Sequence, residues 1–333
     1  KIVGFKMDNN SLKNASLFDN DPVLYAAWLY YQDGLSQSEV ANIMSVSRVT
    51  VVKYLHLARE KGFVNISLDS SVFSTIDYSI RIKAKFNLNN VLILPDEEKN
   101  KSQQTSNMNR ERLAKAGAMY LSQIISNDDI LGVAWGRTIH KLGHYLPTKT
   151  LENVTVLQMI GAVAPQPDFT TAESAALIAN KFSGCSINLH VPAVVSNARL
   201  AMELQAEPII RRNFSALNQC NKALFVVGNT QDDNPLITTG VLTTNEMAQY
   251  RDLGAVGVIC GRFYDAQGNP LLSDIDLRIM GISLAQLRQI PQRIFIAGGV
   301  ENVAATIGAI KGGYATDIVI DEVTALALLE LSI

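Results

Sequence analysis

The sequence predicts an α/β protein with an N-terminal helix-turn-helix unit and a larger, doubly wound, mostly parallel sheet. Two observations lead to this prediction. Near the N-terminus two helical patterns are separated by a three-residue turn, and from residue 90 onward short apolar runs alternate with helical ones. With 333 residues, 47% hydrophobic and 18% charged, the chain is long enough for two domains of ordinary globular composition.

The first helix of the N-terminal pair lies in the stretch LSQSEVANIMSVSRVTVVKYLHLAREKG, which begins at Leu35. Ser36 is followed three residues later by Glu39, which is the spacing of a capping box, so a helix should begin there. Val40, Ile43 and Met44 follow at helical spacing and are expected on its buried side.

The second helix should follow the turn Ser45-Val46-Ser47, with Ser47 as its cap. Adjacent residues of a helix point in different directions, so Val51 and Val52 cannot both face one core. The apolar positions available for packing are Val51, Val52, Leu55 and Leu57.

The start of this second helix is where a helix-turn-helix protein presents side chains to base edges and phosphates. Basic residues predominate locally, yet residues 1 to 70 hold seven basic and seven acidic residues, so affinity should require several such units on one oligomer. The alternative is a structural helical hairpin. The candidate DNA-binding residues are Ser36, Gln37, Ser47, Arg48, Thr50, Lys53 and Tyr54.

Flanking segments complete this unit and connect it to the next. Pro22–Asp33 reads as a helix that ends near Gly34, and Phe63–Leu68 alternates apolar and polar residues as a short strand or wing does. A connecting helix is expected over Tyr78–Phe86. The predicted division is therefore a DNA-binding domain over residues 20–69, a linker over 70–89 and an effector-binding and oligomerisation domain over 90–333.

The larger domain should alternate strands with helices. The expected helices are 110–125, 171–182, 245–252 and 302–311. The expected strands are Val91–Leu94, Ile130–Ala134, Val154–Met159, Ile187–Val191, Ala223–Val227, Val256–Cys260, Arg293–Ala297 and Asp317–Ile320.

Small and polar residues follow four of these strands. Ligands of parallel sheets bind beyond the carboxyl ends of the strands, so these turns are candidates for a small-molecule site, although each alone could be a structural connection. The turns begin near Trp135, Gly161, Val227 and Ala297, and the long second one leads into a helix with Glu173. The candidate residues are Gly136, Arg137, Thr138, Glu173, Gly228, Asn229, Thr230, Gly298 and Gly299.

Several other classes are disfavoured. The net charge of −2 gives no general affinity for nucleic acid or membrane, and no apolar run approaches a bilayer span or signal peptide, which predicts a cytoplasmic protein without membrane partners. Cys185, Cys220 and Cys260 fit reduced core thiols. His140 and His144 have helical ligand spacing but no third ligand nearby in sequence, so neither a metal site nor a cofactor is expected.

An enzyme with an appended DNA-binding unit is the alternative function. A sugar isomerase or deaminase needs a positioned general base, for which Glu173, Asp168 or His190 could be nominated. No compact acid and base constellation appears in the sequence, so we expect no catalytic residues.

Several stretches together resemble the SorC family of bacterial sugar-responsive transcriptional regulators, from about Pro22 to the C-terminus. Two further stretches resemble its deoxyribonucleoside-operon branch, namely Ala172-Glu173 and Leu189–Asn197. The stretches that resemble the family as a whole are Tyr30-Tyr31, Gly34–Gln37, Ser47-Arg48, Thr50-Val51, Asp129–Thr138, Arg262–Asp265 with Gly268, Ala297–Gly299 and Gly312–Tyr314.

This resemblance implies a winged or helix-turn-helix unit, an effector domain related to glucosamine-6-phosphate deaminase and ribose-5-phosphate isomerase, and tetramers on operator DNA. It also implies a sugar-phosphate effector, but three positions depart from the family. Val258 stands where members often have Asp, Asn302 where they have Lys, and Ile160 where the deoxyribonucleoside branch has a Schiff-base Lys. A missing Lys removes a charged contact, so a free sugar, polyol or related metabolite is an alternative to a sugar phosphate, with Asn302 as a contact residue.

Overall fold

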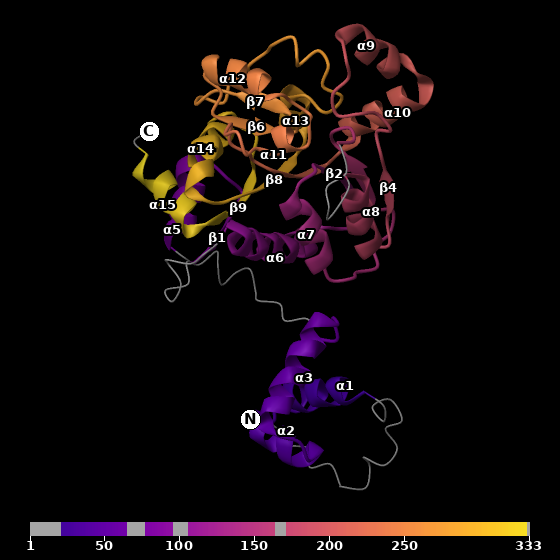
Figure 1. Ribbon diagram of the computed structural model, residues 1–333, viewed down its shortest axis with the longest axis vertical. Coiled ribbons are helices and arrows are strands. Elements are labelled where there is room, and N and C mark those ends of the chain that lie inside the picture. Colours follow the sequence, from indigo (N-terminus) through magenta and orange to yellow (C-terminus); the bar gives the residue numbers. More distant parts are fainter. Residues whose placement is uncertain (1–20, 65–76, 96–105, 164–170, 332–333) are drawn as a thin grey trace. The chain divides into compact units, whose positions relative to one another are not determined.

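The protein has two compact units, Lys1–Ser67 and Leu68–Ile333, each with its own hydrophobic core (Figure 1). They are described here from a computed structural model, which describes residues 21–64, 77–95, 106–163 and 171–331.

The N-terminal unit is helical. Helix α1 (Pro22–Ala27) continues as the π-helical segment η2 (Trp28–Gln32), so the helix predicted over Pro22–Asp33 is confirmed with a wider last turn. Helices α2 (Gln37–Met44) and α3 (Arg48–Glu60) follow. Their apolar sides close one small core, whose fully buried members include Ala26, Val40 and Val51.

Two expectations for this unit need correction, the burial of Ile43 and the strand that begins at Phe63, whereas the different directions of Val51 and Val52 are confirmed. Ile43 is 51% exposed. The residues of α2 that are buried are Val40 and Ala41. Of the two adjacent valines of α3, Val51 is buried and Val52 is 46% exposed, as helical geometry requires. Phe63 and Val64 form no strand, and the rest of the expected wing lies outside the described residues.

The second unit is built on a seven-stranded parallel sheet with strand order β1-β9-β8-β5-β2-β3-β4, which confirms the predicted fold class. The bounds of its strands are β1 Asn90–Leu94, β2 Ile130–Val133, β3 Thr155–Gln158, β4 Cys185–Ile187, β5 Lys222–Val226, β8 Gln292–Ala297 and β9 Asp317–Asp321.

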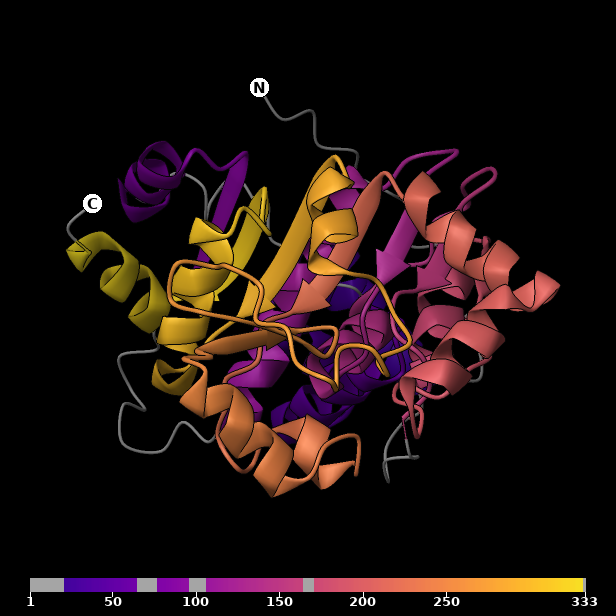
Figure 2. The same cartoon turned by 90° about the horizontal axis from the view of Figure 1, so that it is seen from above.

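Helices cover both faces of this sheet, with α6, α7 and α8 together on one face (Figures 1 and 2). Successive residues of β5 show the two faces, since Leu224 packs in the core beneath α6 to α8 and Phe225 packs in the opposite core. The helices are α5 Asp77–Phe86, α6 Ser106–Ile124, α7 Arg137–Tyr145, α8 Thr171–Lys181, α9 Ala198–Ala206, α10 Pro208–Ala216, η3 Leu217–Gln219, α11 Pro235–Thr238, α12 Thr244–Asp252, α13 Leu284–Gln289, η4 Val300–Asn302, α14 Val303–Lys311 and α15 Glu322–Glu330.

Two predicted strands are wrong in part. Val256–Cys260 does not join the large sheet, because β6 (Gly257–Ile259) pairs antiparallel with β7 (Arg262–Tyr264) in a separate hairpin. The strand expected over Ile187–Val191 lies earlier, because β4 is Cys185–Ile187, and His190, with a positive φ of 58°, is outside the extended region. No described helix combines the length and apolar character needed to cross a membrane.

Candidate functional site

The two helices of the predicted DNA-binding motif are held by local caps. The Ser36 hydroxyl accepts a hydrogen bond from the Glu39 amide (3.3 Å), and the Glu39 carboxylate accepts one from the Ser36 amide (2.8 Å), which confirms the capping box. Hydrogen bonding of the Glu39 carboxylate to the Ser36 side chain and to the Ser36 backbone amide holds the pKa of Glu39 below its usual value. At the second helix the Ser47 hydroxyl accepts from the Thr50 amide (3.1 Å), so the predicted cap of α3 is confirmed.

Two candidate DNA-binding residues contact each other across the turn. Arg48 of α3 donates through Nε to Oε1 of Gln37 of α2 over 3.2 Å, which positions the guanidinium beside the capped helix start. Lys53 is exposed one turn further along, whereas Tyr54 is partly buried against the apolar residues of both small cores. The motif therefore presents Arg48 and Lys53 to solvent and uses part of Tyr54 for packing.

In the second unit, the sheet changes winding direction between β2 and β5. From β2 the chain adds β3 and β4 on one side, and it then returns to place β5 on the other side of β2. Such a switch point leaves a crevice beyond the carboxyl ends of the two strands, because their connections diverge to opposite faces.

A cavity of about 80 Å³ lies at this switch point. Gly136 and Gly228 line it, as the sequence predicts for the turns after β2 and β5. The sequence did not single out Asn234, Cys260 and Gly261, which long-range folding brings there from α11 and the β6–β7 hairpin. Its lining residues are Ala134, Trp135, Gly136, Val226, Gly228, Asn234, Pro235, Leu236, Val258, Cys260 and Gly261.

Close packing explains the glycine after β5. Gly228 exchanges two backbone hydrogen bonds with Val258, which attaches the β6–β7 hairpin to the end of β5. A Cβ atom at Gly228 would lie 3.2 Å from Cγ1 of Val258 and 3.3 Å from Nδ2 of Asn234. A side chain there would therefore crowd the wall of the cavity.

A second group of candidates meets at the carboxyl ends of β5, β8 and β9. Asn229 donates through Nδ2 to Oδ1 of Asn302 (3.1 Å), and Asn302 donates through Nδ2 to the Gly298 carbonyl (2.8 Å). The Gly299 amide donates to Oδ2 of Asp321 (2.7 Å) at the end of β9. Four predicted residues thus form one connected group with Asp321, whose carboxylate the sequence did not identify.

Positive charge lies beside the turn after β2. Gly136, with a φ of 149°, is the N-cap of α7 and supplies no side-chain cap, and Arg137 and Thr138 form the first turn. Burial lowers the pKa of Arg110 of α6; nearby Arg137 lowers it further, while Glu301 opposes both effects. Two guanidiniums and a helix N-terminus at one strand end favour an anionic or strongly polar ligand group.

The remaining candidates have different surroundings. Thr230 is buried and its hydroxyl donates to the Ala255 carbonyl (3.4 Å), whereas Glu173 of α8 and His190 are exposed. Ile160 is fully buried. Asp168 and most of the Gly161–Thr171 turn lie outside the described residues.

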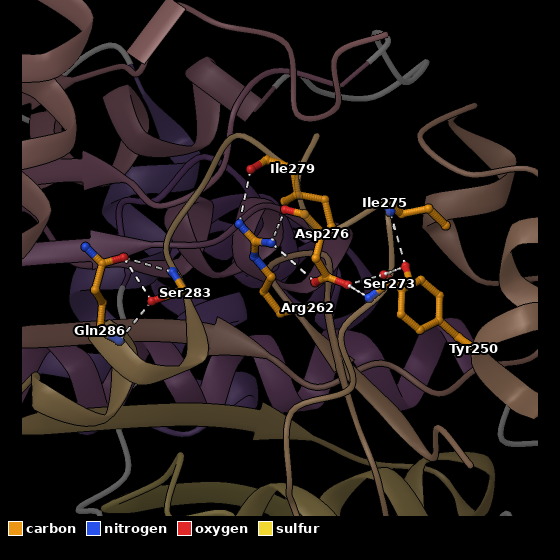
Figure 3. A network of polar contacts seen from close by, with 8 residues as sticks. All are labelled: Tyr250, Arg262, Ser273, Ile275, Asp276, Ile279, Ser283 and Gln286. Atoms are coloured by element: carbon orange, nitrogen blue, oxygen red, sulfur yellow. Dashed lines mark hydrogen bonds and ion pairs between the residues drawn. The ribbon is translucent and has the colours of Figure 1, made fainter. Parts of the chain in front are cut away.

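A buried ion pair fixes the hairpin that forms one wall of the cavity (Figure 3). Nη1 of Arg262 donates to the carbonyl and to the carboxylate of Asp276 (2.7 and 3.3 Å), and Nη2 donates to the Ile279 carbonyl (3.1 Å). The Tyr250 hydroxyl donates to the other Asp276 oxygen (2.6 Å). Burial and this bond to Asp276 raise the pKa of Tyr250. The network therefore ties β7 to the segment around residues 273–279.

The hairpin turn itself consists of two residues with positive φ, Cys260 at 50° and Gly261 at 77°, which is typical of a type I′ turn. All three cysteines are free thiols. Burial raises the pKa of Cys260 and of Cys220 to about 12, so both stay protonated at neutral pH. Cys185 is exposed, so the expectation of a core thiol is wrong for that residue.

The paired histidines form no metal cluster with other described residues. Nε2 of His144 lies 3.1 Å from Nε2 of His140, and Nδ1 of His140 lies 3.4 Å from the Ser174 hydroxyl. Among the residues described, no three His, Cys, Asp or Glu side chains gather as metal ligands would.

A helix pair with a capped, basic second helix, and a sheet with a cavity at its switch point and polar residues at the neighbouring strand ends, together define a two-unit, ligand-responsive type of DNA-binding protein. Residues 70–330 match the family described as "Putative sugar-binding domain". The chain belongs to this family, and its expected resemblance to SorC-type regulators is confirmed.

Curated relatives match almost the whole chain. The transcriptional regulator YjhU of Escherichia coli is 60% identical over 316 residues, which cover 95% of this chain and 96% of the relative. The deoxyribonucleoside regulator of Bacillus subtilis is 33% identical over 305 residues, or 91% of this chain and 95% of that protein.

Solved structures support the fold. The full-length sorbitol operon regulator SorC from Klebsiella pneumoniae matches with a TM-score of 0.74 and 22% identity, covering 98% of this chain and 100% of that one. A DeoR family transcriptional regulator from Listeria monocytogenes matches 77% of this chain and 99% of its own with a TM-score of 0.70 and 23% identity.

Proposed function

We propose that this chain is a DNA-binding transcriptional regulator of a carbohydrate-catabolism operon, controlled by a sugar, polyol or sugar phosphate. The observation that carries the proposal is the presence, in one chain, of a capped helix pair with exposed basic residues and a cavity at a sheet switch point, with polar side chains at the neighbouring strand ends. Ligand binding at the second site changes the affinity of the first for operator DNA, which is an allosteric coupling between two sites.

The DNA contacts in this proposal come from α2 and the start of α3. Arg48 and Lys53 bind phosphates or base edges, and Gln37 positions Arg48 through the 3.2 Å hydrogen bond. Ser36, Ser47, Thr50 and the exposed part of Tyr54 complete the contact surface. The modest local charge favours several units on one assembly, so we infer a homo-oligomer, a tetramer, acting in the cytoplasm where the operator is.

The effector in this proposal lies beyond the ends of β2, β5 and β8. Arg137, Thr138 and the first amides of α7 bind its most polar or anionic group. Asn229 and Asn302 hold hydroxyl groups, because each amide can donate and accept. Gly136, Gly228, Gly298 and Gly299 let the ligand approach the backbone. Glu173 and Thr230 are also proposed to contact the effector, at the edge of this site.

Binding without turnover fits the composition of the cavity. Its lining among the described residues includes no Asp, Glu, His or Lys, and the one thiol, Cys260, is protonated at neutral pH. The Asp321 carboxylate at the end of β9 accepts hydrogen bonds from Asn109 and from the Gly299 and Thr324 amides, so it is held as a structural acceptor. General acid–base catalysis needs such a group within hydrogen-bond reach of the substrate. Incubation of purified protein with sugar phosphates, followed by product analysis, should give no turnover; a measurable product would favour the enzyme alternative.

The DNA-binding half of the proposal is tested by gel shift with full-length protein and the promoter DNA next to its own coding sequence. The double variant Arg48→Ala, Lys53→Ala should abolish the specific shift, and any remaining nonspecific binding should depend less on salt. Arg199→Ala, which removes an 85% exposed arginine from the second unit, is the charge control and should leave the shift intact. Unchanged specific affinity in the double variant would contradict the proposed contact surface.

The effector half is tested with the intrinsic fluorescence of Trp135. The chain has two tryptophans, so Trp28→Phe leaves Trp135 as the single reporter at the cavity. Titration of this variant with sugars, polyols and their phosphates should change its emission for one chemical class, and the same ligand should change the gel shift of wild-type protein. A ligand that changes fluorescence while operator affinity stays constant would contradict the coupling.

A further inference from the structure

The outward face of α3 carries two apolar side chains that the N-terminal core does not use. Val49 is 66% exposed and Val52 is 46% exposed. Val49 is more exposed than any other large hydrophobic side chain in the described part of this unit. Val49 lies opposite the buried positions Val51, Leu55 and Ala58, and Val52 lies at the side of the helix, about 100° from Val51. The core therefore gives no reason for valine at either position.

The cationic side chains of Arg48 and Lys53 flank the two valines on the same helix. Val49, Val52, Lys53 and His56 follow the spacing i, i+3, i+4 and i+7, which places them on one helical face, and all four are exposed. Arg48 adjoins this face at the helix start, where it is held by Gln37. The N-terminal part of this face is thus a pair of valines bordered by Arg48 and Lys53, which suits a polyanion that displays methyl groups, while His56 further along lies 3.5 Å from Glu60.

We propose that Val49 and Val52 read thymine in the operator, with their methyl groups packed against thymine C5-methyl groups in the major groove. This inference rests on the proposed DNA-binding function and deepens it. Of the four bases, only thymine presents a methyl group there, and small apolar side chains are the groups that contact it. In this arrangement Arg48 and Lys53 supply affinity, while Val49 and Val52 supply sequence preference.

The test uses DNA duplexes that full-length wild-type protein selects from a random-sequence pool. Each thymine is replaced in turn by deoxyuridine, which removes only the C5-methyl group. Burial of one methyl group is worth about 0.8 kcal/mol, so we expect about four-fold weaker binding at each contacted thymine. Replacement at other thymines should have no effect.

Variants of the valines assign the lost methyl contact. Val49→Ala or Val52→Ala should bind the thymine duplex about four-fold more weakly and should no longer distinguish thymine from deoxyuridine at one position. Val49→Thr keeps one methyl group and should keep most of the discrimination. Leu253→Ala, which trims a 52% exposed leucine of the second unit, is the control and should retain all of it. The valine variants should leave the salt dependence unchanged, unlike Arg48→Ala.

Two results would overturn the proposal while DNA binding stands. The first is that replacement of thymine by deoxyuridine leaves the affinity of wild-type protein unchanged at every position. The second is that both alanine variants keep the wild-type preference for thymine. If the alanine variants instead alter the mass of the protein in light scattering with no change in thymine preference, the strip contacts a second copy of the chain. Absence of any selected duplex would refute the DNA-binding function itself.

Discussion

The side-chain amide of Asn229 donates a hydrogen bond to that of Asn302 over 3.1 Å. This contact joins the turns that follow β5 and β8, two neighbouring strands whose residues are far apart in the sequence. Asn302 in turn donates to the Gly298 carbonyl, so the pair fixes the backbone around the proposed effector site. The charge at position 302 should therefore affect which ligands bind there.

Asn302→Lys should strengthen the binding of phosphorylated sugars relative to their unphosphorylated partners. A hydrogen bond to a charged group contributes about 1.5–3 kcal/mol, so we expect a gain in relative affinity of about ten-fold or more. The lysine can still donate to the Gly298 carbonyl. Fluorescence titration of the Trp28→Phe protein gives the affinities, with Asn302→Gln as the neutral control. Equal gains in affinity for neutral and phosphorylated sugars would show that residue 302 does not contact the phosphate.

Removal of Asp276 should strongly destabilise the second unit. The side chains of Arg262 and Asp276 are 15% and 7% exposed, and Asp276→Ala leaves the guanidinium buried without its carboxylate. Breaking a buried pair in this way costs about 3–5 kcal/mol. Urea unfolding should show the loss, whereas Arg199→Ala, in an ion pair with 85% and 58% exposed side chains, should cost less than about 1 kcal/mol. Similar losses of stability in the two variants would mean that the buried Arg262–Asp276 pair contributes no more to stability than an exposed ion pair does.

A β-branched residue in the β6–β7 turn should also destabilise the protein. Cys260 has a φ of 50°, a conformation in which branched side chains clash with the backbone. Cys260→Val should therefore lower the free energy of unfolding by about 0.5–1.5 kcal/mol relative to Cys260→Ala, the cost of an unfavourable χ1 angle. Cys185→Val, in the extended strand β4, is the matched control and should be nearly neutral. The prediction fails if valine and alanine at position 260 unfold at the same urea concentration.

The Glu246–Arg278 ion pair should make part of the stability depend on pH. Burial alone would raise the pKa of Glu246, but hydrogen bonds from Thr243 and from Arg278 (2.7 Å) outweigh it and hold the pKa below its model-compound value of 4.5. A carboxylate with a lowered pKa in the folded state stabilises the protein above about pH 4.5, and that contribution is lost as the pH falls through the folded-state pKa.

Glu246→Gln isolates this contribution, because glutamine preserves the capping box with Thr243 and removes the charge. Urea unfolding at pH 7 and at pH 3.5 should show a smaller loss of stability on acidification for the variant than for wild-type protein. An identical pH dependence of the two proteins would show that the pair adds nothing to acid sensitivity.

Local signals made the helix pair and the order of the elements predictable. The capping box at Ser36 and the cap at Ser47 depend on residues three apart, so the sequence displays them directly. The turns with Gly136, Gly228 and Gly298 follow buried strands, which made their position at the strand ends predictable as well.

Contacts between distant residues were not predictable in the same way. A two-residue turn of Cys260 and Gly261 lacks the usual Asn-Gly signal, so the run before it resembled one more parallel strand. Asp321 and Asn234 joined the candidate site only through folding, because neither follows a recognised turn motif. The exposure of Val49 likewise depends on which side of α3 the core occupies.

The pairing of β1 with β9 has a consequence for synthesis of the chain. Asn90 begins β1 and donates a side-chain hydrogen bond to Asp317 of β9 (2.7 Å), and Lys85 of α5 contacts the last carbonyls of α15, those of Leu328, Leu329 and Leu331. During synthesis on the ribosome, β1 cannot pair with β9 until almost the whole polypeptide has been made. The contacts within the first unit can form earlier, because all its residues are made first. A prematurely terminated product would therefore keep a folded helix-turn-helix unit but lack both the proposed effector site and the proposed oligomerisation domain.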